Sequence, residues 1–230
     1  MDGSSETVAG GTVPGSESPA HVLVRVWLPD RPGALGLVAS RVGAVDGDIV
    51  GIDVLERGET VAVDEFAVEL GNVDLLELMV REIEEVDGVS VEEVRFVRTF
   101  PDPRLDALES AADLCESESV VELHQTFVAQ TCREFLADWS ALLDDRNVLA
   151  RVGATPPPDE MLRALAAGTA ASPLVADGTT GPDDLAVAVL DVHQSTLLVG
   201  RDGHPFRRRE RAQLRALAHI ADRAWTLLDR

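Results

Sequence analysis

The sequence predicts an α+β chain, because segments with the two-residue period of strands alternate with segments that have helical spacing. Residues 22–28 carry valine or leucine at every second position, as in a strand with one buried face. Residues 75–86 carry apolar side chains at the spacing of an amphipathic helix. The chain has 230 residues, of which 45% are hydrophobic, so it can form one large or two small domains with packed cores.

Residues 20–99 are predicted to form a first domain with the order βαββαβ. Alternating apolar residues predict strands near 22–28, 50–54, 66–70 and 89–97, and helical spacing predicts helices near 35–45 and 75–86. Gly47 and the pair Asp87-Gly88 are expected to end these helices, and residues 57–59 to form a hairpin turn. Two helices on one face of a four-stranded antiparallel sheet are the ferredoxin-like arrangement.

The turn between the first strand and the first helix has the features of an anion site. Pro32 suits the first position of a helix, because the first amides of a helix have no partner within it. The amides of Gly33, Ala34 and Leu35 are then free at the positive end of the helix dipole, where an amino-acid carboxylate could bind. Gly33 has no side chain, so a ligand can approach the backbone, and Gly33→Val is expected to block it.

The D-x-P-G-x-L turn at residues 30–35, within the complete βαββαβ order, resembles the ACT domain, a small ligand-binding regulatory module. The resemblance implies that an amino acid binds between the first loop and the start of the second strand, at a subunit interface. Asp48 stands where many such domains carry Asn, and its charge would favour the ligand's ammonium group over its carboxylate. The residues expected to bind the ligand are Asp30, Arg31, Pro32, Gly33, Ala34, Leu35, Asp48 and Ile49. The alternative is a helix start and a turn with no ligand.

The remaining chain is predicted to be a tail, a linker and a second domain. Residues 1–19 are rich in glycine, serine, threonine, proline and acidic residues, which is typical of a disordered tail. Residues 100–137 are expected to be a helical linker, in which an acidic break at 116–119 can separate two helices. Leu105, Leu108, Ala112 and Cys115 share one stripe of the first. Residues 138–230 are expected to form strands at 139–143, 148–152, 185–190 and 196–199, and helices at 156–167 and 207–228.

The end of this second domain resembles a GAF domain. The pattern L-x-V-G-R-x-G-x-P-F-x-x-x-E spans residues 197–210, and L-x-x-L-A-x-I-A-D spans residues 214–222. GAF domains are α/β sensor modules built on an antiparallel sheet, so the resemblance implies such a sheet here. It also implies that this domain senses a second ligand or supplies dimer and partner contacts. The segment carries no cyclic-nucleotide signature and no clear chromophore cysteine.

Residues 191–195 could be read as a catalytic triad, but the spacing disfavours it. Asp191, His193 and Ser195 would lie about 6.6 Å apart along an extended strand, too far for the contacts of a triad. A hairpin turn between two strands is the better interpretation. No pair of histidines or cysteines has the spacing of metal ligands. We therefore expect no catalytic residues, no metal site and no cofactor.

Charge and cysteine content limit the partners. The net charge of −21 disfavours nucleic acid and anionic membranes. The basic residues near 207–215 are expected to pair with acidic residues of this protein or to form a solvated helix face. Cys115 and Cys132 are not in a C-x-x-C pair, the apolar runs are short, and there is no signal peptide, which favours the reducing cytoplasm.

The sequence thus predicts a non-catalytic regulatory protein that binds an amino acid or a similar small ligand. It would signal through a homodimer or an unidentified protein partner. The alternative is a ligand-free scaffold for dimerisation or interaction.

Overall fold

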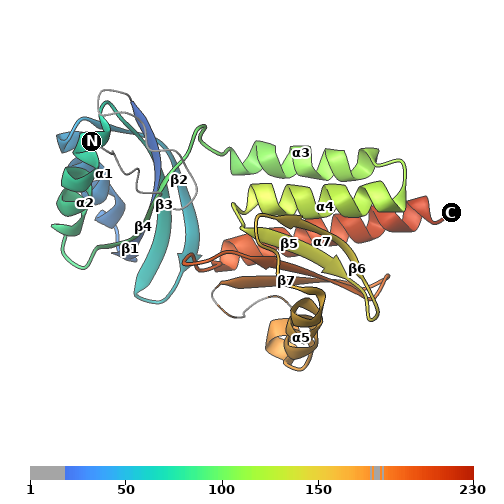
Figure 1. Cartoon of the computed structure of the whole chain (residues 1–230). Helices are drawn as coiled ribbons and strands as arrows, with labels where there is room; N and C mark the ends of the chain where they lie inside the picture. Colours follow the sequence, from blue (N-terminus) through green and yellow to red (C-terminus); the bar gives the residue numbers. More distant parts are fainter. Residues whose placement is uncertain (1–18, 177, 179–181, 183) are drawn as a thin grey trace, which may run out of the picture. The chain divides into compact units, whose positions relative to one another are not determined.

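The chain forms two compact units, Met1–Pro101 and Asp102–Arg230, each with its own four-stranded antiparallel sheet (Figure 1). The computed structural model describes residues 19–176, 178, 182 and 184–230. Of the tail expected at residues 1–19, only Pro19 is among the described residues. The two sheets confirm the predicted α+β class.

The N-terminal unit has the ferredoxin-like order that the sequence predicts. Its elements are β1 (Ala20–Pro29), α1 (Ala34–Ala44), β2 (Gly47–Arg57), β3 (Val61–Leu70), the 3-10 turn η1 (Val73–Leu75), α2 (Leu76–Glu84) and β4 (Ser90–Phe96). The sheet order is β2-β3-β1-β4, so β2 and β4 are its edges. Both helices cover the same face of this sheet (Figure 1).

The core of the N-terminal unit lies between that face and the two helices. Every second residue of β1 points into it: Val22, Val24, Val26 and Leu28 are all buried. They pack with Val38 and Val42 of α1 and with Met79 and Ile83 of α2. The apolar residues that alternate along the strand and those that follow helical spacing therefore form one hydrophobic core.

The end of α1 differs in detail from the expectation. The residue with left-handed backbone is Asp46, whose φ is 57°, whereas Gly47 already belongs to β2. A Cβ atom on Gly47 would lie 2.7 Å from Cγ1 of Val42. Gly47 is therefore required by the close packing of β2 against α1, and not as a helix cap.

The C-terminal unit places helices on both faces of its sheet. Its elements are α3 (Pro103–Glu116), α4 (Val120–Glu134), β5 (Trp139–Leu143), β6 (Val148–Gly153), α5 (Asp159–Ala170), the short α6 (Pro173–Ala176), β7 (Leu185–Leu190), β8 (Ser195–Gly200) and α7 (Arg208–Leu228). The sheet order is β6-β5-β8-β7. One face packs against α4 and α7, and the other packs against α5 (Figure 1).

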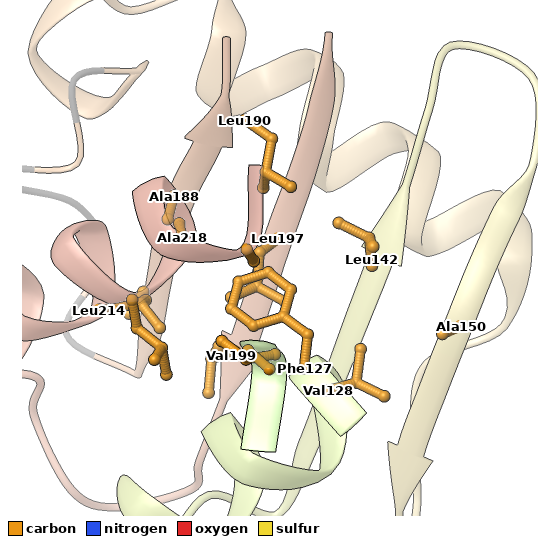
Figure 2. Close-up of a cluster of buried hydrophobic side chains, with 14 of the residues drawn as sticks. Phe127, Val128, Leu142, Ala150, Ala188, Leu190, Leu197, Val199, Leu214 and Ala218 are labelled. Atoms are coloured by element: carbon orange, nitrogen blue, oxygen red, sulfur yellow. The ribbon is translucent and has the colours of Figure 1, made fainter. Parts of the chain in front are cut away.

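The segment 100–137, expected to be a linker, is instead part of this unit. Leu114 of α3, with Leu123 and Phe127 of α4, is buried in a core shared with β5, β8 and α7. Figure 2 shows Phe127 and Val128 pointing toward Leu142 and Leu197 of the sheet. The expected break between the two helices is confirmed, since α4 begins after Ser119, whose hydroxyl accepts a hydrogen bond from the amide of Glu122.

Candidate functional site

The first loop of the N-terminal unit ends in an uncapped helix start. Gly33 has a φ of 88°, which a residue without Cβ adopts at no steric cost, and no side chain caps α1. The amide of Leu37 bonds to the carbonyl of Gly33, and the amide of Ala34 bonds to the carbonyl of Arg31. Within the described part of the chain, the amides of Leu35 and Gly36 are left without an acceptor.

This geometry removes one of the three predicted donors of the anion site and adds another. The sequence predicts a helix start at Pro32 with free amides at Gly33, Ala34 and Leu35. The helix instead begins at Ala34, and the amide of Ala34 is already bonded. Among the described residues, the amides without an acceptor are those of Gly33, Leu35 and Gly36, so two of the three predicted donors stay available at the positive end of the helix dipole.

An ion pair fixes the loop to the end of the neighbouring hairpin. Arg57 Nη2 lies 2.7 Å from Asp30 Oδ1, and the amide of Asp30 donates to the carbonyl of Thr60. The hydrogen bond from Arg57 lowers the pKa of Asp30, so this carboxylate stays charged. The loop therefore carries an ion pair of Asp30 with Arg57 shortly before the start of α1.

A second carboxylate, Asp64 of β3, lies on the buried face of the same end of the sheet. It pairs in register with Val26, and its side chain is only 4% exposed. Burial raises the pKa of Asp64, while the charge of Arg57 acts in the opposite direction. Among the residues that the structure describes, its Oδ1 atom finds no hydrogen-bond partner. Such a carboxylate is costly to bury, which makes Asp64 a candidate for a functional group.

The sequence analysis missed Asp64, although the pattern held a signal. Phe66, Val68 and Leu70 mark the inward face of β3, and Asp64 falls two residues before Phe66 in the same alternation. An acidic residue at an inward position of a strand is unusual. That position could have been singled out from the sequence alone.

The two remaining predicted ligand residues lie at the opposite end of the sheet. Asp48 pairs with Glu69, whereas Arg57 at the other end of β2 pairs with Ala62. Nine residues of extended strand separate Asp48 from Arg57, about 30 Å. The structure therefore brings the loop residues 30–35 together but does not bring Asp48 and Ile49 to them within one chain.

Strand β2 is an apolar edge of its sheet. Val50, Ile52 and Val54 are 49%, 42% and 42% exposed, respectively, although all three are large aliphatic side chains. An edge strand with exposed apolar side chains is a template for pairing with another strand. This edge runs from Asp48 to the neighbourhood of the first loop.

In the C-terminal unit, the conspicuous motif at residues 197–210 has a structural role. The buried guanidinium of Arg201 donates to the carbonyls of Phe135, His204 and Pro205 and pairs with Glu210. Phe206 lies under this guanidinium, with its ring centroid 4.0 Å away. The motif thus joins the end of β8 to the start of α7.

The basic patch expected near residues 207–215 is not a solvated helix face throughout. Arg211 is buried, and its guanidinium donates to the carbonyls of Phe206, Leu185 and Pro182. Arg211 therefore satisfies backbone groups beside the helix.

The residues that could suggest a triad form a hairpin turn, as predicted. β7 ends at Leu190 and β8 begins at Ser195. The hydroxyl of Ser195 donates to the carbonyl of His193 and not to its ring. The ring is held instead by Asp222 of α7, at 2.6 Å from Nδ1, and it stacks on Trp225 with centroids 4.0 Å apart.

A second histidine contacts the other side of Trp225. His124 is buried, and its ring centroid is 4.1 Å from that of Trp225. Burial and the neighbouring ring of His193 lower the pKa of His124, against the raising effect of Asp229. His124 is therefore held in its neutral form inside the unit.

No described helix combines the length and the apolar character needed to cross a lipid bilayer. Among the same residues, no group of three or more His, Cys, Asp or Glu side chains is arranged to hold a metal ion.

The chain has weak similarity to several solved structures. No protein-family model and no curated protein matches the chain. The crystal structure of the ACT domain from GTP pyrophosphokinase of Chlorobium tepidum is 16% identical, covering 35% of this chain and all of that one, with a TM-score of 0.29. The cyanobacteriochrome TePixJ GAF domain is 14% identical over 50% of this chain and 94% of that one, with a TM-score of 0.37.

A longer similarity is to the bacteriophytochrome RpBphP3 from R. palustris. It is 13% identical over 78% of this chain and 48% of that chain, with a TM-score of 0.45. Because identities and TM-scores are this low, the fold assignment rests on the strand order and registers of the chain itself.

Proposed function

We propose that the N-terminal unit binds a free amino acid at the start of α1 and that the chain acts as a non-catalytic regulator. The observations that support this proposal are the unbonded amides of Gly33, Leu35 and Gly36 and the two carboxylates, Asp30 and Asp64, that lie at this end of the sheet. A ligand with one negative and one positive group matches this arrangement. Its carboxylate would accept from the amides, and its ammonium group would face the acidic side.

A second copy of the chain would complete the site. If two β2 strands pair in an antiparallel manner about a two-fold axis near Ile52, the partner subunit's Asp48 lies opposite Glu56 and next to Arg57. The partner's Ile49 then also approaches the first loop. The exposed aliphatic side chains of the two β2 strands would cover each other. All eight predicted ligand residues would then form two sites per dimer.

Regulation would follow from linkage. A ligand held by groups from two chains binds the paired arrangement more tightly than the separate one, and it shifts the equilibrium by that difference in affinity. In this proposal the C-terminal unit, whose fold is comparable with sensor domains, binds a second ligand or passes the change to an unidentified protein partner. The proposed location is the cytoplasm.

The first experiment is thermal denaturation of the full chain against each of the twenty amino acids. Ligand at a hundred times its Kd should stabilise the folded chain by about 2.7 kcal/mol. The structure also shows which variant to use. Gly33→Val would strain a residue with φ of 88°, so its failure to bind would be ambiguous.

Gly36→Leu is the better test. A Cβ at Gly36 meets nothing within 4 Å, and a side chain on a helix leans toward the preceding turn, here over the free amides. Gly43→Leu is the matched control, because Gly43 lies in the same helix with the same open space. The proposal expects a selective shift that Gly36→Leu abolishes and Gly43→Leu keeps. No shift with any amino acid would contradict it.

The exposed row on β2 also supports a second candidate, a scaffold that dimerises without a ligand. In that case Ile52→Lys would lower the dimer fraction in analytical ultracentrifugation, while no amino acid would change the melting temperature. The amino-acid sensor predicts instead that Ile52→Lys lowers both dimerisation and ligand affinity.

A further inference from the structure

Helix α3 leaves one apolar stripe uncovered. Leu105 is 51% exposed and Leu108 is 70% exposed, and Ala112 and Cys115 are also exposed. The opposite face of the helix is the one that packs, with Leu114 buried in the core of the C-terminal unit. The sequence predicts the stripe, but the structure shows that this stripe faces outward.

The spacing of the stripe is that of a coiled-coil seam. Successive members are three, four and three residues apart, which corresponds to positions a, d, a and d of two heptads. Helices whose apolar residues merely fill an intramolecular core need no such strict repeat. The residues at the opposite positions, such as Ser110 and Ser117, are buried against the unit itself.

We propose that this stripe pairs with the same stripe of a second copy, as a short parallel two-helix seam. The flanking charges favour this orientation. In a parallel pair, position g of one helix faces position e of the other five residues further on, so Arg104 faces Glu109 of the partner subunit on both sides. An antiparallel pair would instead place glutamates, Glu109 and Glu116, along the same edge.

Two heptads are a short seam, but the helix is already ordered. α3 is capped at its start by Asp102, whose carboxylate accepts from the amides of Arg104 and Leu105, and it is anchored by Leu114. Pairing therefore costs little conformational entropy. This inference concerns the C-terminal unit alone and does not depend on the amino-acid site or on the β2 edge.

Cys115 provides a direct test of the seam and of its orientation. In the parallel pair Cys115 faces its own copy across the two-fold axis at a d position, whereas in an antiparallel pair it faces Leu105 of the partner subunit. Mild oxidation of the full chain should give a dimer linked through Cys115, seen on a non-reducing gel and by intact mass. Cys115→Ser should abolish it, because Cys132 is half-buried with its thiol against the carbonyl of Ala137.

Two sets of variants separate a specific seam from random collision. Leu108→Lys should lower the cross-linked fraction by about tenfold or more, because it puts a charge into the seam. Met161→Lys is the control, since Met161 is also more than half exposed but lies on α5, at the other face of the sheet. Arg104→Glu should also lower cross-linking, and adding Glu109→Arg should restore it.

The outcomes decide the proposal. Cross-linking through Cys115 that Leu108→Lys removes and that the double charge reversal restores would support it. Absence of a Cys115-linked dimer in the full chain would overturn it. A dimer whose cross-linked fraction is the same in Leu108→Lys and Met161→Lys would also overturn it, because contact would then not depend on the stripe.

Discussion

Arg201 Nη2 lies 2.7 Å from Glu210 Oε1, and these side chains are only 2% and 12% exposed. The pair connects the loop after β8 to the first turn of α7. Glu210 also accepts from the amide of Arg207, which begins that helix. A single buried ion pair therefore sets where the longest helix of the C-terminal unit starts.

Arg201→Met should destabilise the chain by about 3–5 kcal/mol, because it leaves a buried carboxylate unpaired. Three backbone carbonyls would lose a donor at the same time. Urea unfolding followed by circular dichroism measures this loss. Arg208→Met, at an exposed position of the same helix, should change the free energy of unfolding by less than about 0.5 kcal/mol. Equal effects of the two variants would contradict this role of Arg201.

Two glycines of the C-terminal unit should respond oppositely to alanine. A Cβ on Gly200 would lie 2.2 Å from the indole of Trp139, so Gly200→Ala should destabilise the chain by about 1–3 kcal/mol or more. Gly168 lies in α5 with open space around its Cβ position, so Gly168→Ala should stabilise the helix by about 0.5–1 kcal/mol. Melting temperatures of the two variants should move in opposite directions.

His124 should make the stability of the C-terminal unit depend on pH. Its pKa is lowered in the folded chain by burial and by His193, so the unfolded chain binds the proton more tightly. The stability is complete above the unfolded pKa of about 6.5 and is lost as the pH falls through the lower, folded value. Chemical denaturation between pH 8 and pH 5 measures this loss, which should be smaller in His124→Phe. The same pH dependence in both proteins would exclude His124 as its source.

Asp64 should lower the stability of the folded chain and contribute to binding of the amino-acid ligand. Its pKa is raised by burial, so the folded chain favours the protonated form, and stability should increase as the pH falls through the folded pKa. Asp64→Asn removes this charge with little change of shape, so it should stabilise the chain by about 1–3 kcal/mol at pH 7. The same variant should lose the thermal shift produced by the amino-acid ligand. A variant that keeps the full ligand shift would remove Asp64 from the proposed site.

The sequence was sufficient to predict the helices and strands, but not to predict how they pack together. The helical stripe of α2 has a single apolar face, so its type and its buried side could be read directly. The alternation in β1 identifies the row that faces the helices, but it does not show that Leu23 and Arg25 on the other face are buried as well. The outward direction of Leu108 could not be read, because α3 has apolar residues on two faces and only the packing against α4 and α7 selects one. For the same reason the sequence predicts a linker at residues 100–137, whereas the structure packs α3 and α4 into the core of the C-terminal unit.

The candidate site at the start of α1 could also be predicted only in part, because only some of its features depend on residues that are adjacent in the sequence. Local sequence places Gly33 at a turn and leaves free amides just after it, since both depend on adjacent residues. The ion pair of Asp30 with Arg57 depends on how β1 and β2 are placed against β3, which one sequence does not specify, whereas the inward position of Asp64 follows from the alternation in β3. The helix start was displaced by two residues because a bond from Ala34 to Arg31 closes the turn first.

The separation of Asp48 from its own first loop has a consequence for mixtures of defective chains. If each pocket combines a loop from one chain with Asp48 from the other, a chain carrying Gly36→Leu and a chain carrying Asp48→Arg are each inactive alone. Random pairing of equal amounts gives a mixed dimer in half of the cases, and one of its two pockets has no substitution. About a quarter of the pockets would then regain function on mixing, a form of complementation that a pocket made within one chain could never show.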